Sequence, residues 1–439
     1  VSRGDRVGVL FSQDAWCAAA HIAIWKIGAI SVPLFKLFAR DALESRIGDS
    51  GLSLVVTDEE GAEMLGGLAE ALLPYDLPEG DVETVDTGAE EPAVLIYTSG
   101  TTGKPKGALH AHRMLTGHLP GVEISHDFLG QEGDVIWTPA DWAWIGGLFD
   151  VLMPGLALGV PVVAARLPKF TGQEAERICR EGGVRNVFFP PTALRMLKVA
   201  DQEISGLRSV ASGGEPLGAE MLAWGRKAFG VSINEFYGQT ECNMSVSSCG
   251  ALFAPVGGAT GKAVPGFDVQ VIDESGKVTD GEGDIAVKRG AASMMLEYWN
   301  KPEATAEKFR GDWLVTGGRG GVEGDFIRFL GREDDVISSG GYRIGPAEIE
   351  DCLMTHSAVA TVGVVGKPDA LRHEIVKAYV VLKDGAEASA EELQTWVKTR
   401  LASYSYPREV EFLEALPMTV TGKVIRKELK ARAAEEEKT

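Results

Sequence analysis

A segment rich in glycine and hydroxyl side chains carries the clearest chemical signal in the sequence. Residues 97–107 read YTSGTTGKPKG and follow the apolar run AVLI. The glycines expose backbone N–H donors, while the hydroxyls and two lysines add further donors and positive charge. This combination suits the binding of a polyphosphate. We predict phosphate contacts from Thr98, Ser99, Gly100, Thr101, Thr102, Gly103, Lys104 and Lys106.

The same segment does not match the P-loop of nucleoside triphosphatases. That loop requires GxxxxGK followed by Ser or Thr. Here Thr98 stands at the position of the first glycine, and Pro105 stands at the position of the hydroxyl residue. A flexible linker is the alternative interpretation, but a linker needs no ordered spacing of glycines, hydroxyls and lysines. Phosphate binding is therefore the stronger interpretation.

Composition restricts the partners of the chain. Its net charge of −20 argues against nucleic acid and anionic membranes, because both surfaces would repel it. No apolar run approaches the length of a membrane span, so we expect none. The five cysteines are scattered without any C-x-x-C pair, which predicts free thiols and a cytoplasmic location. The sequence leaves open whether the chain forms a homo-oligomer.

The pattern of apolar residues predicts an α/β fold in more than one domain. A chain of 439 residues is too long for one compact core. Residues 6–11 predict a buried strand, 14–28 a helix, and 29–35 and 53–58 two further strands, whereas 60–92 predict a surface connection. After residue 256, short alternating strands indicate a small β subdomain. Beyond residue 332 a compact α+β segment follows, so we place the domain boundary at 331–335.

Five motifs in order resemble those of the acyl-adenylate-forming, AMP-binding enzymes. They are residues 98–107 (TSGTTGKPKG), 212–217 (SGGEPL), 235–241 (EFYGQTE), 313–317 (WLVTG) with 331–332 (GR), and 420–426 (VTGKVIR). Within that family the chain is similar to short- and medium-chain acyl-CoA synthetases. The resemblance implies an N-terminally shortened adenylation domain, residues 1–331, with the small β subdomain. Residues 332–439 are then a small, mobile α+β domain carrying the catalytic lysine.

The resemblance implies an ATP-dependent acyl-CoA synthetase, an acid–thiol ligase. Such an enzyme converts a small carboxylic acid, ATP and coenzyme A, with Mg²⁺, into acyl-CoA, AMP and pyrophosphate through an acyl-AMP intermediate. Lys423 matches the catalytic lysine that approaches the carboxylate and the α-phosphate, where negative charge gathers during attack. The small domain is expected to rotate about Asp334 between the two half-reactions.

The remaining nucleotide contacts are also implied by the resemblance. The turn of Gly214, Glu215 and Pro216 would line the adenine pocket, and Arg332 would contact the ribose. Within the third motif, Tyr237 would stack on the base, Thr240 would bond a phosphate, and Glu241 would ligate Mg²⁺. We assign the whole motif to the site, with Thr240 and Glu241 as catalytic groups: Glu235, Phe236, Tyr237, Gly238, Gln239, Thr240 and Glu241.

The coenzyme A and acyl sites are implied more loosely. Relatives carry SGYRIGP where this chain has Gly340, Gly341, Tyr342 and Arg343, so a glycine replaces the serine. Arg343 also corresponds to a phosphate-contacting arginine. Further coenzyme A contacts are predicted at Arg372, Lys398 and Tyr406, although Lys398 could equally be an ordinary surface charge. In residues 141–152, an apolar acyl slot or plain core is predicted from Trp142, Trp144 and Gly146.

Some positions depart from the family pattern. Gly318 follows Thr316-Gly317, where relatives have an aspartate that holds both ribose hydroxyls, and residues 281–284 contract a G-E-x-G-E motif. We therefore expect weakened nucleotide binding if the sequence is complete. Two alternatives remain: an adenylating enzyme whose acceptor is a carrier protein, and a nucleotide-binding descendant with weakened catalysis. Short, medium and aryl acids all stay open as substrates.

Overall fold

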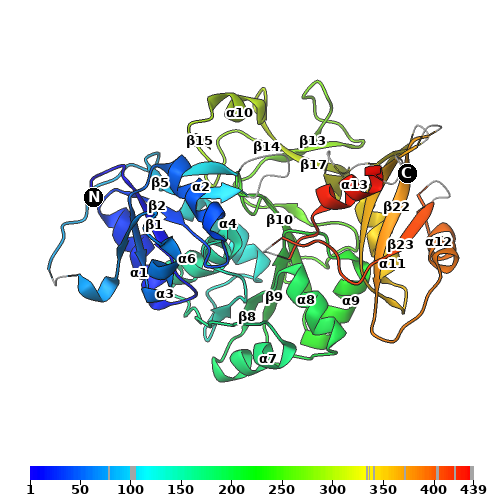
Figure 1. Cartoon of the computed structure of the whole chain (residues 1–439), viewed down its shortest axis with the longest axis horizontal. Helices are drawn as coiled ribbons and strands as arrows, with labels where there is room; N and C mark the ends of the chain where they lie inside the picture. Colours follow the sequence, from blue (N-terminus) through cyan, green and yellow to red (C-terminus); the bar gives the residue numbers. More distant parts are fainter. Residues whose placement is uncertain are drawn as a thin grey trace.

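The computed structural model describes residues 1–77, 80–98, 105–332, 335, 337–339, 342–369, 372–401, 405–419 and 422–435. The N-terminus lies at one end of an elongated molecule, and the last helix lies at the other end (Figure 1). Four sheets follow one another along the chain, and each has its own hydrophobic core.

The first sheet has seven strands in the order β15-β6-β5-β2-β1-β3-β4. The strands from β5 to β4 are parallel, and β6 returns antiparallel to β5. The strands are β1 (Arg6–Leu10), β2 (Ile30–Pro33), β3 (Leu54–Thr57), β4 (Glu70–Leu72), β5 (Pro92–Thr98), β6 (Lys106–Ala111) and β15 (Glu297–Tyr298). The helices of this region are α1 (Ala15–Lys26), α2 (Arg40–Ser50), α3 (Glu59–Leu65) and α4 (Met114–Ser125).

Local chemistry explains where α1 begins and ends. The Asp14 side chain accepts a hydrogen bond from the Trp16 amide at the helix N-terminus. Gly28 takes a φ of 72°, which lets the chain turn sharply into β2. The strand, helix and strand predicted for residues 6–35 are therefore present.

The second sheet has the order β12-β11-β10-β9-β8-β7, and its four strands from β7 to β10 are parallel. The parallel strands are β7 (Ile136–Trp137), β8 (Asn186–Phe188), β9 (Ser209–Gly213) and β10 (Ile233–Tyr237), and the edge strands are β11 (Val246–Ser247) and β12 (Lys262–Ala263). The helices are α5 (Ile145–Gly147), η2 (Leu148–Leu152), α6 (Met153–Ala157), α7 (Gly172–Glu181), α8 (Pro191–Val199) and α9 (Gly218–Phe229). In Figure 1, α8 and α9 lie toward the C-terminal part of the molecule.

The third sheet is antiparallel and forms the predicted small β subdomain. Strand order is β13-β14-β17-β16, and β18 pairs with β17. The elements are β13 (Val269–Ile272), β14 (Gly283–Lys288), α10 (Pro302–Glu307), β16 (Phe309–Arg310), β17 (Trp313–Glu323) and β18 (Phe326–Arg332).

The fourth sheet belongs to the C-terminal part. Strand order is β20-β19-β22-β21, with β23 beside β22. The elements are β19 (Ile337–Ser339), β20 (Tyr342–Ile344), α11 (Pro346–Met354), β21 (Val359–Asp369), β22 (His373–Leu382), α12 (Ala390–Lys398), β23 (Glu409–Phe412) and α13 (Arg426–Glu435). The predicted fold class, a large α/β region with a β subdomain and a small α+β domain, is confirmed.

One segment differs from the sequence prediction. Residues 60–92 include α3, β4 and the short helix η1 (Pro74–Asp76), not only a surface connection. The Asp58 side chain accepts a hydrogen bond from the Gly61 amide and so starts α3, while β4 is a three-residue edge strand too short to show a period. The C-terminal α+β segment ends in α13, whose Leu429 and Ala433 are buried.

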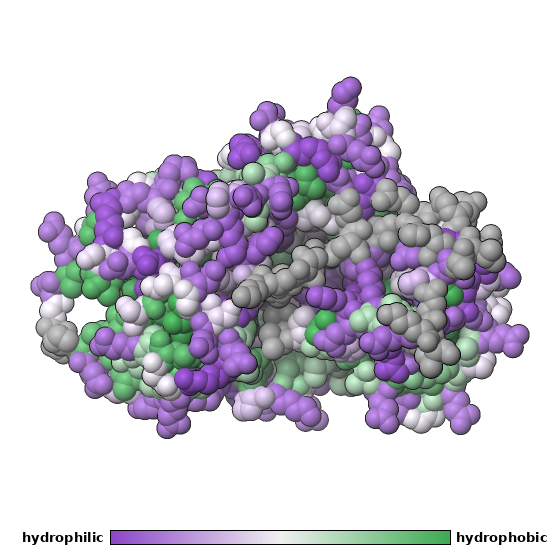
Figure 2. Space-filling model, turned by 45° about the horizontal axis from the view of Figure 1, so that its top comes forward, coloured by the Kyte–Doolittle hydropathy of each residue, from purple (hydrophilic) through white to green (hydrophobic). Residues whose placement is uncertain are grey.

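The face of the molecule shown in Figure 2 is mainly polar. In the view of Figure 2, hydrophilic side chains cover most of the face, and the hydrophobic areas between them are small and separate. Among the described residues, no helix combines the length and the apolar character that crossing a membrane would require.

Candidate active site

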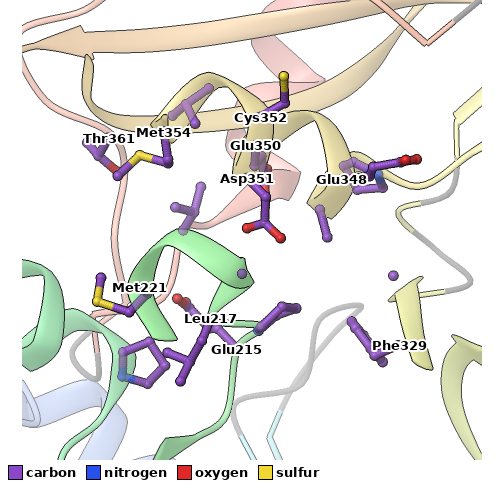
Figure 3. Close-up of a pocket in the computed structure, with 18 of the residues that line it drawn as sticks. Glu215, Leu217, Met221, Phe329, Glu348, Glu350, Asp351, Cys352, Met354 and Thr361 are labelled. Atoms are coloured by element: carbon purple, nitrogen blue, oxygen red, sulfur yellow. The ribbon is translucent and has the colours of Figure 1, made fainter. Parts of the chain in front are cut away.

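A cleft of about 1150 Å³ lies between the second sheet and the C-terminal part. One wall is formed by the turn of Gly214, Glu215 and Pro216 together with the first residues of α9. The opposite wall is formed by α11 and by the segment that contains Lys423. Figure 3 shows Asp351 of α11 pointing across the cleft toward Leu217. Residues far apart in the chain therefore face a common space.

The turn after β9 brings three predicted site residues together. Gly214 has a φ of 104°, which side-chain-bearing residues rarely adopt. A Cβ built on Gly214 would lie 3.6 Å from Lys423 Nζ and 3.9 Å from Trp144 Cη2. The ammonium group and the indole thus converge over this glycine. Glu215, the next residue, forms a 2.6 Å ion pair with Arg195 of α8.

Lys423 is tied by hydrogen bonds to Thr419, and we call the described residues Thr419, Gly422 and Lys423 the lysine loop. The Thr419 amide donates to the Lys423 carbonyl at 2.7 Å, and the Lys423 amide donates to Thr419 Oγ1 at 3.0 Å. Gly422 has a φ of 79°, and its carbonyl accepts a 2.9 Å hydrogen bond from Thr192 of α8. The loop is therefore closed on itself and docked on the second sheet's helices.

The ends of the phosphate-type segment lie beside Glu241. Thr98 Oγ1 donates to the Lys106 carbonyl at 3.3 Å, and Lys106 Nζ lies 5.2 Å from the centre of the Tyr298 ring. The Tyr298 hydroxyl donates to a Glu241 carboxylate oxygen, and Glu241 is only 7% exposed. Tyr298 thus joins two motifs that are distant in sequence. The predicted residues between them lie outside the described residues: Ser99, Gly100, Thr101, Thr102, Gly103 and Lys104.

Glu241 is suited to share a magnesium ion with a bound nucleotide. Mg²⁺ usually takes one or two carboxylates and completes its shell with phosphate oxygens and water. In the part of the chain that the structure describes, no group of three or more His, Cys, Asp and Glu side chains could hold a metal alone. A single oriented carboxylate beside a phosphate-type segment fits that mode of binding.

The residues of the third motif point in different directions. The Phe236 ring is buried and packs 5.2 Å from Phe188 in the core, while the Tyr237 ring lies 5.5 Å from Phe329 of β18. Gln239 donates to the Thr316 carbonyl at 3.3 Å. A side chain on Gly238 would collide with the Met244 amide. Thr240 is half-buried.

Two carboxyl groups influence each other electrostatically: that of Asp351, which lines the cleft, and that of buried Glu235. Burial, and then the nearby Asp351 carboxyl, raises the pKa of Glu235 to about 8. Burial and the charge of Glu350 raise the pKa of Asp351 to about 7. The Asp351 side chain, which comes from α11, packs against the first turn of α9, since a Cβ on Gly218 would be 2.8 Å from the Asp351 carboxyl carbon. Both carboxyl groups therefore titrate near neutral pH while the walls are together.

The space beside Gly318 is occupied by the side chains of Tyr237 and Phe329. A Cβ built there would lie 2.6 Å from the Tyr237 hydroxyl and 2.8 Å from the Phe329 ring. Gly318 pairs directly with Arg332 across β17 and β18, although the Arg332 side chain lies outside the described part. The contracted motif has a structural use, because buried Asp284 pairs with Arg310 at 2.7 Å.

The predicted acyl-slot residues separate into two environments. Trp144 is half-buried, and its ring covers Gly146, whose added Cβ would lie 2.7 Å from Trp144 Cη2. Trp144 also packs 5.8 Å from Phe188. Trp142 is 2% exposed and belongs to the core of the first sheet. Of the two tryptophans, Trp144 is the one next to Gly214 and the cleft.

Three of the predicted coenzyme A residues, Arg372, Lys398 and Tyr406, lie in the described C-terminal part. Lys398 Nζ lies 5.3 Å from the Tyr406 ring centre, and the Arg372 amide donates to Asp369 Oδ1 at 2.8 Å. Arg372, Lys398 and Tyr406 are absent from the described lining of the cleft. Gly340 and Gly341 fall outside the described residues, as do the side chains of Tyr342 and Arg343, whose backbone forms β20.

Sequence reasoning missed Thr192, Arg195, Tyr298 and Asp351. None of them belongs to a motif, and each reaches the site through a contact between distant segments. A hydroxyl at the second residue of a helix, as at Thr192, carries no signal of its partner 230 residues away. The pairing of β15 with β6, which positions Tyr298, consists of only two residue pairs, so the sequence gives little sign of it.

Comparisons with known proteins agree with this architecture. The family described as AMP-binding enzyme matches residues 1–299, and the AMP-binding enzyme C-terminal domain matches residues 348–423. Acetyl-coenzyme A synthetase of Bacillus subtilis is 34% identical over 98% of this chain and 81% of its own length. The mitochondrial acyl-coenzyme A synthetase ACSM4 of Homo sapiens is 33% identical over 98% of this chain and 80% of its own.

A solved structure gives the same result. The crystal structure of ATP-bound MatB from Rhodopseudomonas palustris has a TM-score of 0.87 and 26% identity, covering 98% of this chain and 89% of that one. The chain belongs to the AMP-binding enzyme family. The resemblance to short- and medium-chain acyl-CoA synthetases is confirmed, and so is the predicted class, an AMP-forming acid–thiol ligase that uses ATP, Mg²⁺ and coenzyme A.

Proposed function

We propose that this chain joins a small carboxylic acid to coenzyme A at the expense of ATP, through an acyl-AMP intermediate. The position of Lys423 is the observation that carries the proposal. Its ammonium group lies over Gly214, which the Trp144 ring also approaches, and Gly214 and Lys423 line the same cleft. The names of the similar synthetases support the same reaction.

The first half-reaction needs charge and positioning, not a protein nucleophile. The carboxylate of the acid attacks the α-phosphorus, the bond to pyrophosphate breaks, and pyrophosphate leaves with its electron pair. Lys423 would stabilise the negative charge that develops on the α-phosphoryl oxygens. Glu241, oriented by the Tyr298 hydroxyl, would hold Mg²⁺ together with the phosphates. The bound ion supplies charge neutralisation for the departing pyrophosphate.

We infer that the second half-reaction uses a different placement of the C-terminal domain. We propose residues 1–331 as the adenylation domain and 332–439 as the mobile domain, with Asp334 at the hinge. Support comes from β18, which ends at Arg332, and from the separation of Arg372, Lys398 and Tyr406 from the cleft. The coenzyme A thiolate would attack the acyl carbon, and AMP would leave.

The decisive test is ATP–pyrophosphate exchange screened over acetate, propionate, butyrate, octanoate and benzoate, with a reaction lacking acid as control. Acid-dependent exchange followed by acyl-CoA formation on adding coenzyme A supports the proposal. Exchange with acyl transfer only to a carrier protein would replace the proposed acceptor. Complete lack of exchange with every acid, from a folded preparation that binds ATP, would leave only a nucleotide-binding descendant.

We also propose a reducing compartment, the cytoplasm, for this enzyme. All five cysteines are free and buried, as expected for a chain that folds without disulfides. Fractionation of the source cells tests this location, and recovery with a membrane or organelle fraction contradicts it. Light scattering of the purified chain tests the homo-oligomer that the sequence left open.

A further inference from the structure

The hydroxyl of Thr192 makes a direct contact with the lysine loop. Thr192 lies in the first turn of α8, and its Oγ1 is 2.9 Å from the Gly422 carbonyl oxygen. The same oxygen is 3.4 Å from an Arg195 guanidinium nitrogen. A guanidinium can only donate, so the threonine oxygen accepts from Arg195 and gives its own proton to the Gly422 carbonyl. The hydroxyl does not cap its own helix.

Gly422 makes this close approach possible. A Cβ on Gly422 would lie 2.6 Å from Thr192 Oγ1, and the residue has a φ of 79°. Three hydrogen bonds tie Gly422 and Lys423 to Thr419: Thr419 bonds both the amide and the carbonyl of Lys423 and accepts from the Gly422 amide at 2.9 Å. Holding the Gly422 carbonyl therefore also holds the backbone of Lys423.

Two further contacts connect Thr192 to the turn of Gly214, Glu215 and Pro216, which faces Lys423. Arg195, which donates to Thr192, is paired with Glu215 at 2.6 Å. Glu215 directly follows Gly214, over which the Lys423 ammonium lies. The helix α8 therefore contacts both the backbone of the lysine loop, through Thr192, and the turn that faces the Lys423 ammonium group, through Arg195.

We propose that Thr192 is a positioning residue that holds the lysine loop against α8 and so aims Lys423 at the reacting phosphate during acyl-AMP formation. The inference rests on the proposed function and adds a residue outside all five motifs. Thr192 acts through Gly422 and does not touch the substrates. Its loss should slow adenylate formation and leave thioester formation unchanged, because the second half-reaction does not use the docked lysine.

The test compares Thr192→Val with Thr192→Ser. Valine keeps the shape and removes the donor, leaving the Gly422 carbonyl without its partner, whereas serine keeps the hydroxyl. We expect Thr192→Val to lower kcat for ATP–pyrophosphate exchange about tenfold, with the KM for ATP within about twofold. Thr192→Ser should stay within about twofold of the unmodified enzyme. Formation of acyl-CoA from supplied acyl-AMP should be the same in all three.

A second measurement needs no catalysis. In the nucleotide-free protein, an acetylating reagent modifies Lys423 at a rate that peptide mass spectrometry can follow. Undocking the loop should expose the half-buried lysine, so Thr192→Val should be acetylated several-fold faster than the unmodified chain, while Thr192→Ser should not. Equal acetylation rates together with equal exchange rates would overturn the inference.

Matched controls separate positioning from stability and from the proposed function. Thr171→Val removes a hydroxyl that caps the neighbouring helix α7, so it should lower the melting temperature without changing the ratio of the two half-reactions. A similar change in that ratio would mean that Thr192 acts only through stability. If the unmodified enzyme exchanges no pyrophosphate, the proposed function fails, while the acetylation rates still decide whether Thr192 holds the loop.

Discussion

The two walls of the cleft are built differently. The wall of the adenylation domain consists of turns at the ends of strands, such as Gly214 after β9, and of Glu241 held by Tyr298. The opposite wall comes from the C-terminal part. Its contacts with the rest of the molecule include the hydrogen bond of Thr192 with Gly422 and the packing of Asp351 of α11 against Gly218 of α9. The wall with Gly214 and Glu241 is therefore held by a sheet and a buried hydrogen bond, and we call it the fixed wall. The wall with Lys423 is held by contacts between distant segments; we propose that it can move away, and we call it the removable wall.

This difference suits a two-step reaction. Preorganised donors cost no rearrangement when charge develops, which favours a fixed nucleotide wall. A wall held by individual hydrogen bonds can leave after the first step, because each such bond contributes only about 1 kcal/mol net. Changes to each wall should therefore have distinguishable effects, and four substitutions test this.

The largest effect is expected from Lys423→Ala on the removable wall. Loss of the ammonium should reduce ATP–pyrophosphate exchange at least about a hundredfold, because the charge on the α-phosphoryl oxygens loses its partner. Acyl-CoA formation from supplied acyl-AMP should be nearly unchanged. Equal loss in both assays would contradict the proposed division of labour between the walls.

On the fixed wall, Tyr298→Phe should have a smaller and different effect. The ring that faces Lys106 stays, but Glu241 loses the hydroxyl that orients its carboxylate. We expect the Mg²⁺ concentration for half-maximal exchange to rise about tenfold, as is typical when the partner of a metal ligand is lost. The exchange rate at saturating Mg²⁺ should recover. An unchanged Mg²⁺ requirement would argue against Glu241 as the ligand.

The electrostatic interaction of Asp351 with Glu235, and the packing of Asp351 against Gly218 of α9, should make the removable wall sensitive to pH. Both pKa values are raised in the docked arrangement, to about 7 and about 8, so docking binds protons. The favourable contribution is complete below the ordinary carboxyl pKa and is lost as pH rises through about 7 to 8. The groups that set the Asp351 pKa are Glu348 and Glu350 of its own helix, Arg195 of α8 and Glu220 of α9, and Glu235 of β10 faces it as well.

Asp351→Asn tests this linkage because asparagine resembles the protonated acid at every pH. Exchange by the unmodified enzyme should fall with rising pH, and the ratio of the Asp351→Asn rate to the unmodified rate should be about fivefold larger near pH 8 than near pH 6. Exposed Glu348 on the same helix provides the comparison, because its charge is one of the smaller influences on the Asp351 pKa. Glu348→Gln should therefore change the profile less than Asp351→Asn does. Parallel profiles for Asp351→Asn and the unmodified enzyme would rule out the contact as the cause.

The smallest effect on binding is expected from Gly318→Asp. A side chain at this position meets the Tyr237 hydroxyl and the Phe329 ring, so it must displace one of them. We expect ATP affinity, measured by calorimetric titration, to stay within about threefold, and the free energy of unfolding to fall by about 1–3 kcal/mol. A tenfold or larger gain in affinity would instead support the weakened nucleotide binding expected from the sequence.

Much of the fold could be predicted because its signals are local. The buried strands and the glycine-ended helix of residues 6–35 follow from apolar runs and a single φ requirement at Gly28. The helix α3 was missed, because a seven-residue segment with three glutamates does not show a clear period. The edge strand β4 was missed because it has only three residues.

The sequence by itself determined the chemistry that is available: a phosphate-type segment, a glycine turn, Glu241 and Lys423, each written in consecutive residues. Only the tertiary structure decided which of these groups meet and what holds them. It placed Trp144 beside Gly214 and Trp142 in the core, and it joined Thr192 to Gly422 over 230 residues. The physical reason is that motifs depend on local backbone geometry, whereas contacts between domains depend on packing that no single segment encodes.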